Sequence, residues 1–264
     1  MIELKVEDYH LATRLLQQVP FNTLFAQSVI QGRNPGRVFV DRWEQPGACY
    51  IASAYGMSLL CGESKDPFFQ DTLIGYLRNE RQQRNQQEWL QVHPDSWNDL
   101  LSNLAETGKI EEHTRVNFTF SPSNHQSLME QLRSEAQQPE IVAVNEDMFN
   151  HFEGSVIPRH FWKEAAQFLT AGAGFCVIEN GRPASMAFSA YRIEGTLEIG
   201  IETAEQARGK GYAIQACCAL IQYCVEHGLE PVWSCRRENE GSYRLAQKLG
   251  FIPSVRIPYY LLKL

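Results

Sequence analysis

Glycines and cations alternate in one short stretch that is well suited to chemistry. It consists of Arg208, Gly209, Lys210, Gly211, Tyr212 and Ala213, and it stands between a predicted strand and a predicted helix. The first N–H groups of a helix lack partners within the helix, and the helix dipole places positive charge at the same end. Glycine backbone can curl around a phosphate because no Cβ intervenes. The stretch therefore predicts a pyrophosphate site, with a tight packing turn as the alternative.

Other chemistries have less support in the sequence. The glycine pair Gly172 and Gly174 precedes a strand instead of opening a helix, and no phosphate-loop motif of nucleotide triphosphatases occurs, so neither that class nor a dinucleotide enzyme is expected. The seven histidines and seven cysteines have no metal-ligand spacing, so no metal is expected. The cysteines lie mostly in apolar runs, which predicts reduced thiols in the core.

The elements that position the glycine stretch form the second half of the chain. We expect strands at 141–145, 175–180, 184–193, 196–203, 231–235 and 255–262, and helices at 160–172, 212–228 and 239–249. Short turns join the strands from 175 to 203 into an antiparallel meander, and the glycine stretch follows it. This order predicts an α/β (α+β) fold whose sheet is mixed.

The first half carries no such loop. We expect helices at 6–18 and 22–31, three strands between 37 and 64, and a helix from 66 whose apolar stripe of Phe68, Leu73, Ile74 and Leu77 leads into a polar, exposed helix end. A helix at 96–104, a strand at 114–120, a helix at 123–136 and a linker at 137–139 follow. The expected domains are therefore 1–140 and 141–264.

Composition limits the partners. The 264 residues include 44% hydrophobic and 21% charged residues, as in globular proteins, and no apolar run is long enough to span a bilayer. The start of the chain does not resemble a signal peptide, so we expect a cytoplasmic protein without membrane contact. With 24 basic and 31 acidic residues the net charge is -7, which disfavours nucleic acid and suits an amine substrate.

The glycine stretch resembles the pyrophosphate loop of the GNAT superfamily of acetyl-CoA-dependent N-acetyltransferases. That pattern, Gln or Arg, two residues, Gly, one residue, then Gly or Ala, is matched by Arg208, Gly211 and Ala213, and in a second register by Gln206, Gly209 and Gly211. The run from Asn239 to Phe251 is similar to the closing KLGF segment of the superfamily. Within it, the chain resembles the zwittermicin A resistance-type acetyltransferases.

This resemblance implies a C-terminal GNAT fold, with a mostly antiparallel sheet flanked by helices, behind an N-terminal accessory or degenerate GNAT-like α/β domain. It implies acetyl-CoA as co-substrate, with the loop from Arg208 to Ala213 on its pyrophosphate. The backbone of Ile201, Glu202 and Thr203 would pair with the pantetheine arm as an added strand does. Asn239 would cap a helix and bond the same arm.

Acetyl transfer requires a base for the amine and a proton for the leaving thiolate. Glu198 and Glu202 are the candidate bases, because residues four apart on a strand share a face unless a bulge intervenes. We expect burial among apolar neighbours to raise the pKa of Glu198 towards neutrality, and a solvent-facing glutamate is the alternative. The family's general-acid tyrosine is replaced by Ala246, so Tyr243 or Ser242 would substitute, unless Tyr243 packs in the core.

The sequence thus predicts a GNAT-type N-acetyltransferase that acetylates a primary amine of a small molecule, an antibiotic or a metabolite, by direct attack in a ternary complex. Two alternatives stay open: a non-catalytic acyl-CoA-binding regulatory module, and an acyltransferase acting on a peptide or protein amine. The oligomeric state is not predicted.

Overall fold

The computed structural model describes residues 1–106, 108–133 and 139–264. In chain order the elements are β1 (Ile2–Glu3), η1 (Val6–Ala12), α1 (Thr13–Leu16), α2 (Leu24–Ile30), β2 (Gly36–Val40), β3 (Ala48–Ser53), β4 (Met57–Gly62), α3 (Pro67–Leu77), β5 (Glu88–His93), α4 (Ser96–Ala105), β6 (Ile110–Phe120), α5 (Pro122–Arg133), β7 (Glu140–Ala143), α6 (Glu146–His151), η2 (Pro158–His160), α7 (Ala165–Ala171), β8 (Gly174–Glu179), β9 (Arg182–Ile193), β10 (Thr196–Thr203), η3 (Glu205–Ala207), α8 (Tyr212–Glu226), β11 (Glu230–Arg236), α9 (Glu240–Lys248) and β12 (Phe251–Leu262). The structure is therefore a mixed α/β fold.

The chain folds into two compact units. Unit 1 comprises Met1–Arg115, Arg236–Glu238 and Arg256–Leu264, and unit 2 comprises Val116–Cys235 and Asn239–Val255. The strands β6 and β12 each contribute residues to both units, so a single cut of the chain at residue 140 does not describe this division. Of the expected linker, residues 137 and 138 lie outside the described residues, as does the end of the helix expected at 123–136.

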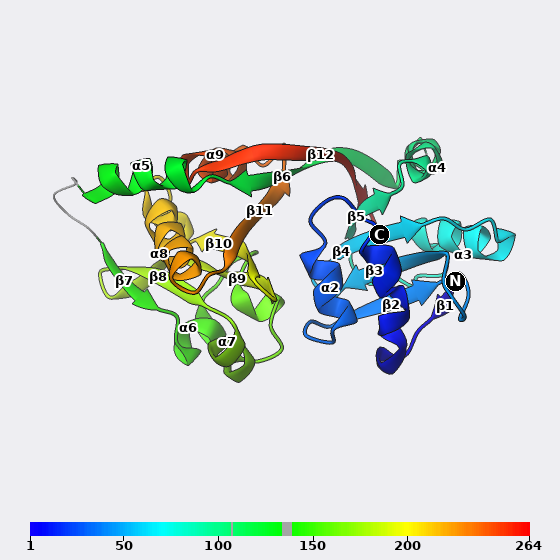
Figure 1. Ribbon diagram of the computed structural model, residues 1–264, viewed down its shortest axis with the longest axis horizontal. Helices are drawn as coiled ribbons and strands as arrows, with labels where there is room; N and C mark the ends of the chain where they lie inside the picture. The colour runs from blue at the N-terminus through cyan, green and yellow to red at the C-terminus, as the bar shows by residue number, and fades with distance from the viewer. Residues whose placement is uncertain (107, 134–138) are drawn as a thin grey trace. The chain divides into compact units, whose positions relative to one another are not determined.

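Unit 2 is built on strands in the order β12-β6-β11-β10-β9-β8-β7. Helix α8 lies on one face of β8, β9 and β10, and α6 and α7 lie on the other face (Figure 1). The core on the α8 face includes Cys217, Leu220 and Ile221 of the helix, which pack with Leu197 of β10 and Trp233 of β11. The stripe of apolar residues on α8 thus fixes the helix against the strands that carry the candidate site.

The expected elements of unit 2 are largely confirmed. Strand β10 has the bounds expected from the sequence, Thr196–Thr203, and α8, β11 and α9 begin within one residue of expectation. Helix α6 was not expected, although Asn145 caps it by accepting a hydrogen bond from the backbone N–H of Met148 at 2.9 Å. Its six residues are too few for a clear apolar period.

Unit 1 is built on strands in the order β1-β2-β3-β4-β5-β12. Helices α3 and α4 pack against one face through a core that includes Phe69, Leu73, Trp97 and Leu101. Within this core the carboxylate of Glu88 is 4% exposed and accepts hydrogen bonds from the hydroxyls of Tyr50 (2.5 Å) and Tyr76 (2.7 Å). Burial, and then the Glu88 charge, raise the pKa of both tyrosines, so both hydroxyls stay protonated and donate.

The polar run after α3 was interpreted wrongly as the end of a helix. Helix α3 ends at Leu77, and residues 88–93 form the buried strand β5. Arg84 is 4% exposed, and its guanidinium donates to the backbone oxygens of Tyr76 (3.2 Å) and Leu77 (3.1 Å). These hydrogen bonds anchor the segment between α3 and β5 to the end of the helix. The expected apolar stripe is also wrong at Phe68, which is 65% exposed, because Phe69 enters the core in its place.

Both units contain a strand-helix-strand segment with parallel strands, but the two segments differ where a cofactor would bind. In unit 1, β4 and β5 stay paired from Met57 opposite Trp89 to Cys61 opposite His93. The turn into α3 has no glycine after Gly62, and the carboxylate of Asp66 caps the helix by accepting from the N–H of Phe68 at 3.0 Å. A carboxylate therefore occupies the helix end that an anion would need.

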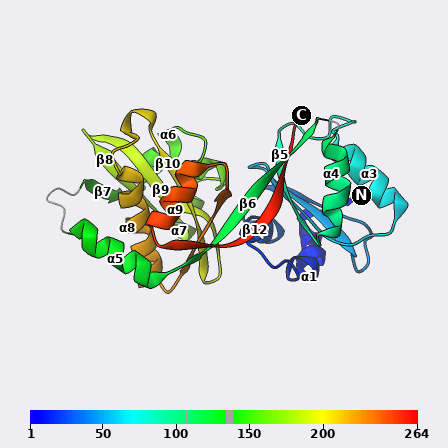
Figure 2. The same ribbon diagram turned by 90° about the horizontal axis from the view of Figure 1, so that it is seen from above.

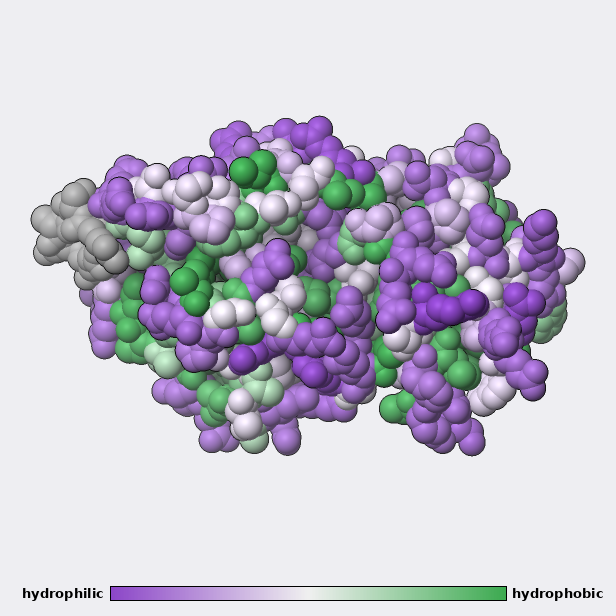
Figure 3. Space-filling model, in the orientation of Figure 1, coloured by the Kyte–Doolittle hydropathy of each residue, from purple (hydrophilic) through white to green (hydrophobic). Residues whose placement is uncertain are grey.

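The large apolar side chains that are exposed include Trp43 and Phe68 in unit 1 and Leu169 and Val225 in unit 2. On the surface drawn in Figure 3, hydrophobic residues are interspersed with hydrophilic ones. Among the described residues, no helix has the length and apolar character needed to cross a membrane. Figure 2 shows the same elements from above, with β6 and β12 running alongside each other.

Candidate functional site

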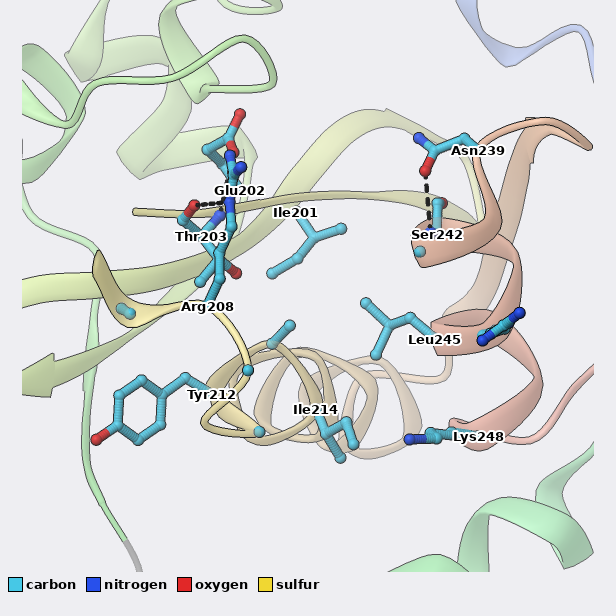
Figure 4. Close-up of a pocket in the computed structure, with 16 residues that line it drawn as sticks. Ile201, Glu202, Thr203, Arg208, Tyr212, Ile214, Asn239, Ser242, Leu245 and Lys248 are labelled. Atoms are coloured by element: carbon cyan, nitrogen blue, oxygen red, sulfur yellow. Dashed lines mark hydrogen bonds and ion pairs between the residues drawn. The ribbon is translucent and has the colours of Figure 1, made fainter. Parts of the chain in front are cut away.

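A cavity of about 520 Å³ opens in unit 2 where the end of β10, the start of α8 and one face of α9 meet (Figure 4). Ten residues named in the sequence analysis line it: Ile201, Glu202, Thr203, Arg208, Gly209, Gly211, Tyr212, Ala213, Asn239 and Ser242. They come from three separate segments of the chain. The structure therefore brings most of the predicted site into one cavity.

The cavity exists because two strands separate. Strands β10 and β11 pair in parallel from Thr196 opposite Glu230 to Glu198 opposite Val232, and their pairing ends there. Beyond Glu198, β10 continues through Ile201–Thr203 along the cavity, where β9 is its one partner among the described strands. This leaves one edge of the β10 backbone available for an extended ligand that adds as a strand.

The glycine loop has the backbone that only glycine adopts readily. Gly209 (φ 79°) and Gly211 (φ 82°) are both left-handed, and Gly211 is the N-cap of α8. A Cβ at either position would meet no heavy atom within 4 Å, so the space above the loop is open. The loop is thus a cradle that a ligand can enter closely, and substitution is opposed by backbone strain instead of by crowding.

The side chains of Lys210 and Tyr212 are engaged outside the cradle. Lys210 Nζ lies 2.8 Å from Oε1 of Glu179 on β8, and the Tyr212 hydroxyl donates to the same oxygen at 2.7 Å. In Figure 4 the ring of Tyr212 points away from the other labelled side chains. Lys210, unlike the other five residues of the loop, does not line the cavity. Its charge therefore ties the loop to β8, and only its backbone is placed to serve the cradle.

The contact of Glu179 with Lys210 and Tyr212 should make the stability of the protein depend on pH. Hydrogen bonds from Lys210, and then from Tyr212, hold the pKa of the Glu179 carboxyl below its ordinary value. A lowered pKa means that the ionised carboxylate stabilises the fold above its ordinary pKa, and that this stabilisation is lost as the pH falls through the folded-state pKa. We expect Glu179→Gln to lower the melting temperature at pH 7, by an amount that shrinks as the pH falls from about 4.3 through the lower folded-state pKa. Melting curves between pH 3 and pH 7 test this, and a difference that does not change with pH would contradict it.

The two candidate bases differ in their surroundings. Leu197, Ile199 and Ile201 pack on the α8 face, so Glu198 and Glu202 lie on the opposite face of β10. The expected irregularity is present, but it inserts its extra residue, Ala190, into β9, which leaves the alternation along β10 intact. Glu198 is 6% exposed and does not line the cavity.

Glu202 lines the cavity with both carboxylate oxygens in use. Oε2 accepts from the backbone N–H groups of Ser155 (2.8 Å) and Val156 (3.0 Å) and from the Ser155 hydroxyl (3.2 Å). Oε1 accepts from the N–H of Thr203 at 3.2 Å, and a guanidinium nitrogen of Arg208 lies 3.8 Å away. This set of donors is that of a structural anchor, in contrast to the expectation of a base.

Helix α9 presents the remaining candidates. Asn239 is its N-cap and accepts from the N–H of Ser242 at 3.1 Å, which confirms its capping role. The Ser242 hydroxyl accepts from the Trp233 indole at 3.2 Å and faces the cavity. Tyr243 stacks edge-on against Phe118 with ring centres 5.4 Å apart, packs on the core and is not among the lining residues. Ala246 is fully buried.

Sequence reasoning missed part of the α9 wall. Gly241, Arg244, Leu245 and Lys248 line the cavity at helical spacing, next to Ser242. Arg244 also pairs with Glu240 at 2.7 Å. Together with Arg208, these side chains give the lining three cationic groups against the one carboxylate of Glu202. Such a lining suits an anionic ligand. The spacing of 241, 244, 245 and 248 after the cap would have identified this face.

Comparisons with known proteins agree with this architecture. The family model described as GNAT acetyltransferase matches residues 13–260. The chain belongs to the GNAT acetyltransferase family and is an acetyltransferase. The uncharacterized N-acetyltransferase YdfB of Bacillus subtilis (strain 168) is 25% identical over 229 residues, which cover 86% of this chain and 85% of that protein.

Two solved structures share the fold. A GCN5-related N-acetyltransferase-like protein from Streptococcus suis 89/1591 aligns with a TM-score of 0.74 at 22% identity, over 96% of this chain and 98% of its own. A tandem GNAT protein from the clavulanic acid biosynthesis pathway aligns with a TM-score of 0.63 at 8% identity, over 98% and 97%. The zwittermicin-type subgroup stays a prediction.

Proposed function

We propose that this acetyltransferase moves the acetyl group of acetyl-CoA to a primary amine of a small molecule. The observation that carries the proposal is the meeting, in one cavity, of a left-handed glycine cradle at a helix N-terminus and a strand edge that no described strand pairs with. Unit 1 forms a strand-helix-strand segment without either feature, since its strands stay paired and its helix is capped by a carboxylate.

The cradle and the strand edge fit different parts of acetyl-CoA. The N–H groups from Arg208 to Ala213 would hold the pyrophosphate at the start of α8, where the helix dipole favours negative charge. The backbone of Ile201–Thr203 would pair with the amides of the pantetheine arm, and the Asn239 side chain would bond the same arm beside the cap. Arg244 and Lys248 place positive charge for phosphate on the α9 side.

The chain's own groups then act on the amine. Acetyl-CoA supplies an acetyl group whose bond to sulfur breaks as the bond to nitrogen forms. Glu198 would take the proton from the amine, backbone N–H groups of β10 would polarise the carbonyl, and the Ser242 hydroxyl would donate a proton to sulfur. Tyr243 is the second candidate donor, but its packing against Phe118 favours Ser242.

Direct attack in a ternary complex is favoured over a covalent acyl-enzyme. The seven cysteines are free and buried. Burial raises the pKa of Cys176 to about 11 and that of Cys218 to about 12, so neither thiol is a thiolate at neutral pH. The net charge of -7 favours an amine as acceptor, as does the resemblance to the antibiotic-resistance subgroup.

A spectrophotometric assay of CoA release tests the proposal. We expect saturable release that depends on one class of small primary amine in a panel that also contains peptide amines, with no release in the absence of an amine. Binding of acetyl-CoA without release of CoA on any amine would favour the non-catalytic module. The replacement of the family's usual tyrosine by Ala246 is the observation that supports this alternative. Release on peptides alone would favour the peptide acyltransferase.

A further inference from the structure

The loop of residues 153–157, between α6 and η2, is fastened to the candidate cofactor strand by one side chain. The Glu202 side chain is 11% exposed, and its Oε2 atom accepts both backbone N–H groups at the centre of the loop, those of Ser155 and Val156. The contact joins residues 47 positions apart. A Cβ on Gly154 would overlap the Cγ of Glu202, so the loop lies directly against the side chain.

Hydrogen bonds and ring contacts connect the loop to residues 158–161, which follow it in the chain. The Arg159 guanidinium donates to the backbone oxygen of Asn150 (3.1 Å) and pairs with Glu153 (2.9 Å). Phe161 then packs at a tilt against Phe188 and edge-on against Tyr191 of β9, with ring centres 5.5 Å away in each case. Movement of the loop would therefore be transmitted to Phe161.

This segment covers the face of the sheet that carries Glu198. Tyr191 is opposite Glu198 in the β9–β10 pairing. A Cβ at Gly200, the next residue on that face, would touch the ring of Phe188, which confirms that the ring lies over β10. Glu202 thus lines the cofactor cavity and also contacts the loop that leads into this segment.

We propose that Glu202 is a positioning residue that couples the acyl-CoA cavity to the segment bordering the acceptor amine. Its carboxylate sets the position of residues 153–161, and through them the walls around Glu198. An acyl-CoA arm paired with Ile201–Thr203 would hold β10, and with it Glu202 and the loop. The coupling to acyl-CoA rests on the proposed function, whereas the fastening of the loop does not.

Hydrogen exchange of the Ser155 and Val156 amides tests the fastening in the protein without ligand. We expect Glu202→Ala to speed their exchange at least about tenfold, since each amide loses its acceptor. Glu202→Gln keeps one acceptor oxygen and should have an intermediate effect. Glu205→Ala removes an exposed carboxylate three residues away and serves as the control. Unchanged exchange in Glu202→Ala, with a folded protein by circular dichroism, would overturn the proposal.

Amide exchange in the presence of CoA, together with steady-state kinetics, tests the coupling between the acyl-CoA cavity and the segment near the acceptor amine. In wild type, CoA should slow exchange at both amides, and Glu202→Ala should abolish this effect while CoA binding changes by less than about threefold. The Michaelis constant for the amine should rise about tenfold, against less than about threefold for acetyl-CoA. A loss confined to kcat, without change in either Michaelis constant or in exchange, would identify Glu202 as the base and overturn a positioning role. If wild type binds no CoA, the proposed function fails, and the exchange result still decides the fastening.

Discussion

Gly211→Ala weakens acetyl-CoA binding at least about tenfold, which corresponds to about 1.4 kcal/mol, if the glycine cradle holds the pyrophosphate. Gly211 is at φ 82° with open space above it, so an added methyl group occupies the place where a phosphate would approach the loop. The same change costs about 1 kcal/mol in stability because alanine is strained in a left-handed backbone. Isothermal titration with acetyl-CoA and thermal unfolding measure the two effects separately.

The chain offers a matched control at the other end of the same helix. Gly228 follows α8, is also left-handed at φ 64° and likewise has no heavy atom within 4 Å of an added Cβ. Gly228→Ala should therefore cost similar stability and leave the dissociation constant for acetyl-CoA within about twofold. Equal weakening by both variants would mean that strain in α8, and not the cradle, governs binding. Undiminished binding in Gly211→Ala would remove the cradle from the cofactor site.

The second large effect concerns the proposed base. Glu198→Gln is expected to lower kcat by about 10² to 10⁴, the usual range for loss of a general base. Glutamine has the same shape and fits a position that is 6% exposed, so the fold and the dissociation constant for acetyl-CoA should be retained. Steady-state kinetics at saturating amine, with calorimetric binding of acetyl-CoA, give both numbers.

Glu230→Gln is the control for this variant. Glu230 is an exposed residue at the start of β11, opposite Thr196 in the same parallel pair, and it is not among the residues that line the cavity. It should retain wild-type kcat. A loss of less than about threefold in Glu198→Gln would exclude Glu198 as the base and leave proton removal to solvent or to another group.

The contrast between the two units explains why only one half of the sequence carries a recognisable site. Both halves encode parallel strands joined by a helix, but unit 1 has Asp66 and Pro67 where unit 2 has Gly211 and Tyr212. The carboxylate cap satisfies the helix in unit 1, and the full pairing of β4 with β5 closes the strand edge.

The sequence by itself determined the elements whose signals are local. The bounds of β10, the start of α8 and the cap at Asn239 follow from apolar alternation, left-handed glycines and side-chain capping, all of which act within a few residues. The strand β5 escaped prediction because its Glu88 and Gln91 are polar yet buried, and Glu88 accepts hydrogen bonds from Tyr50 and Tyr76, which lie 38 and 12 positions away in the sequence.

The tertiary structure alone decided what the charged side chains do. Lys210 sits in the cofactor motif, but Glu179, 31 residues earlier, binds its ammonium group. Glu202 has the position of a base, but a loop 47 residues earlier occupies its carboxylate. A charged group interacts with whatever lies within a few ångströms in space, and chain separation does not limit that reach. Backbone conformation could thus be predicted from neighbours in sequence, whereas the partners of Lys210 and Glu202 required the folded chain.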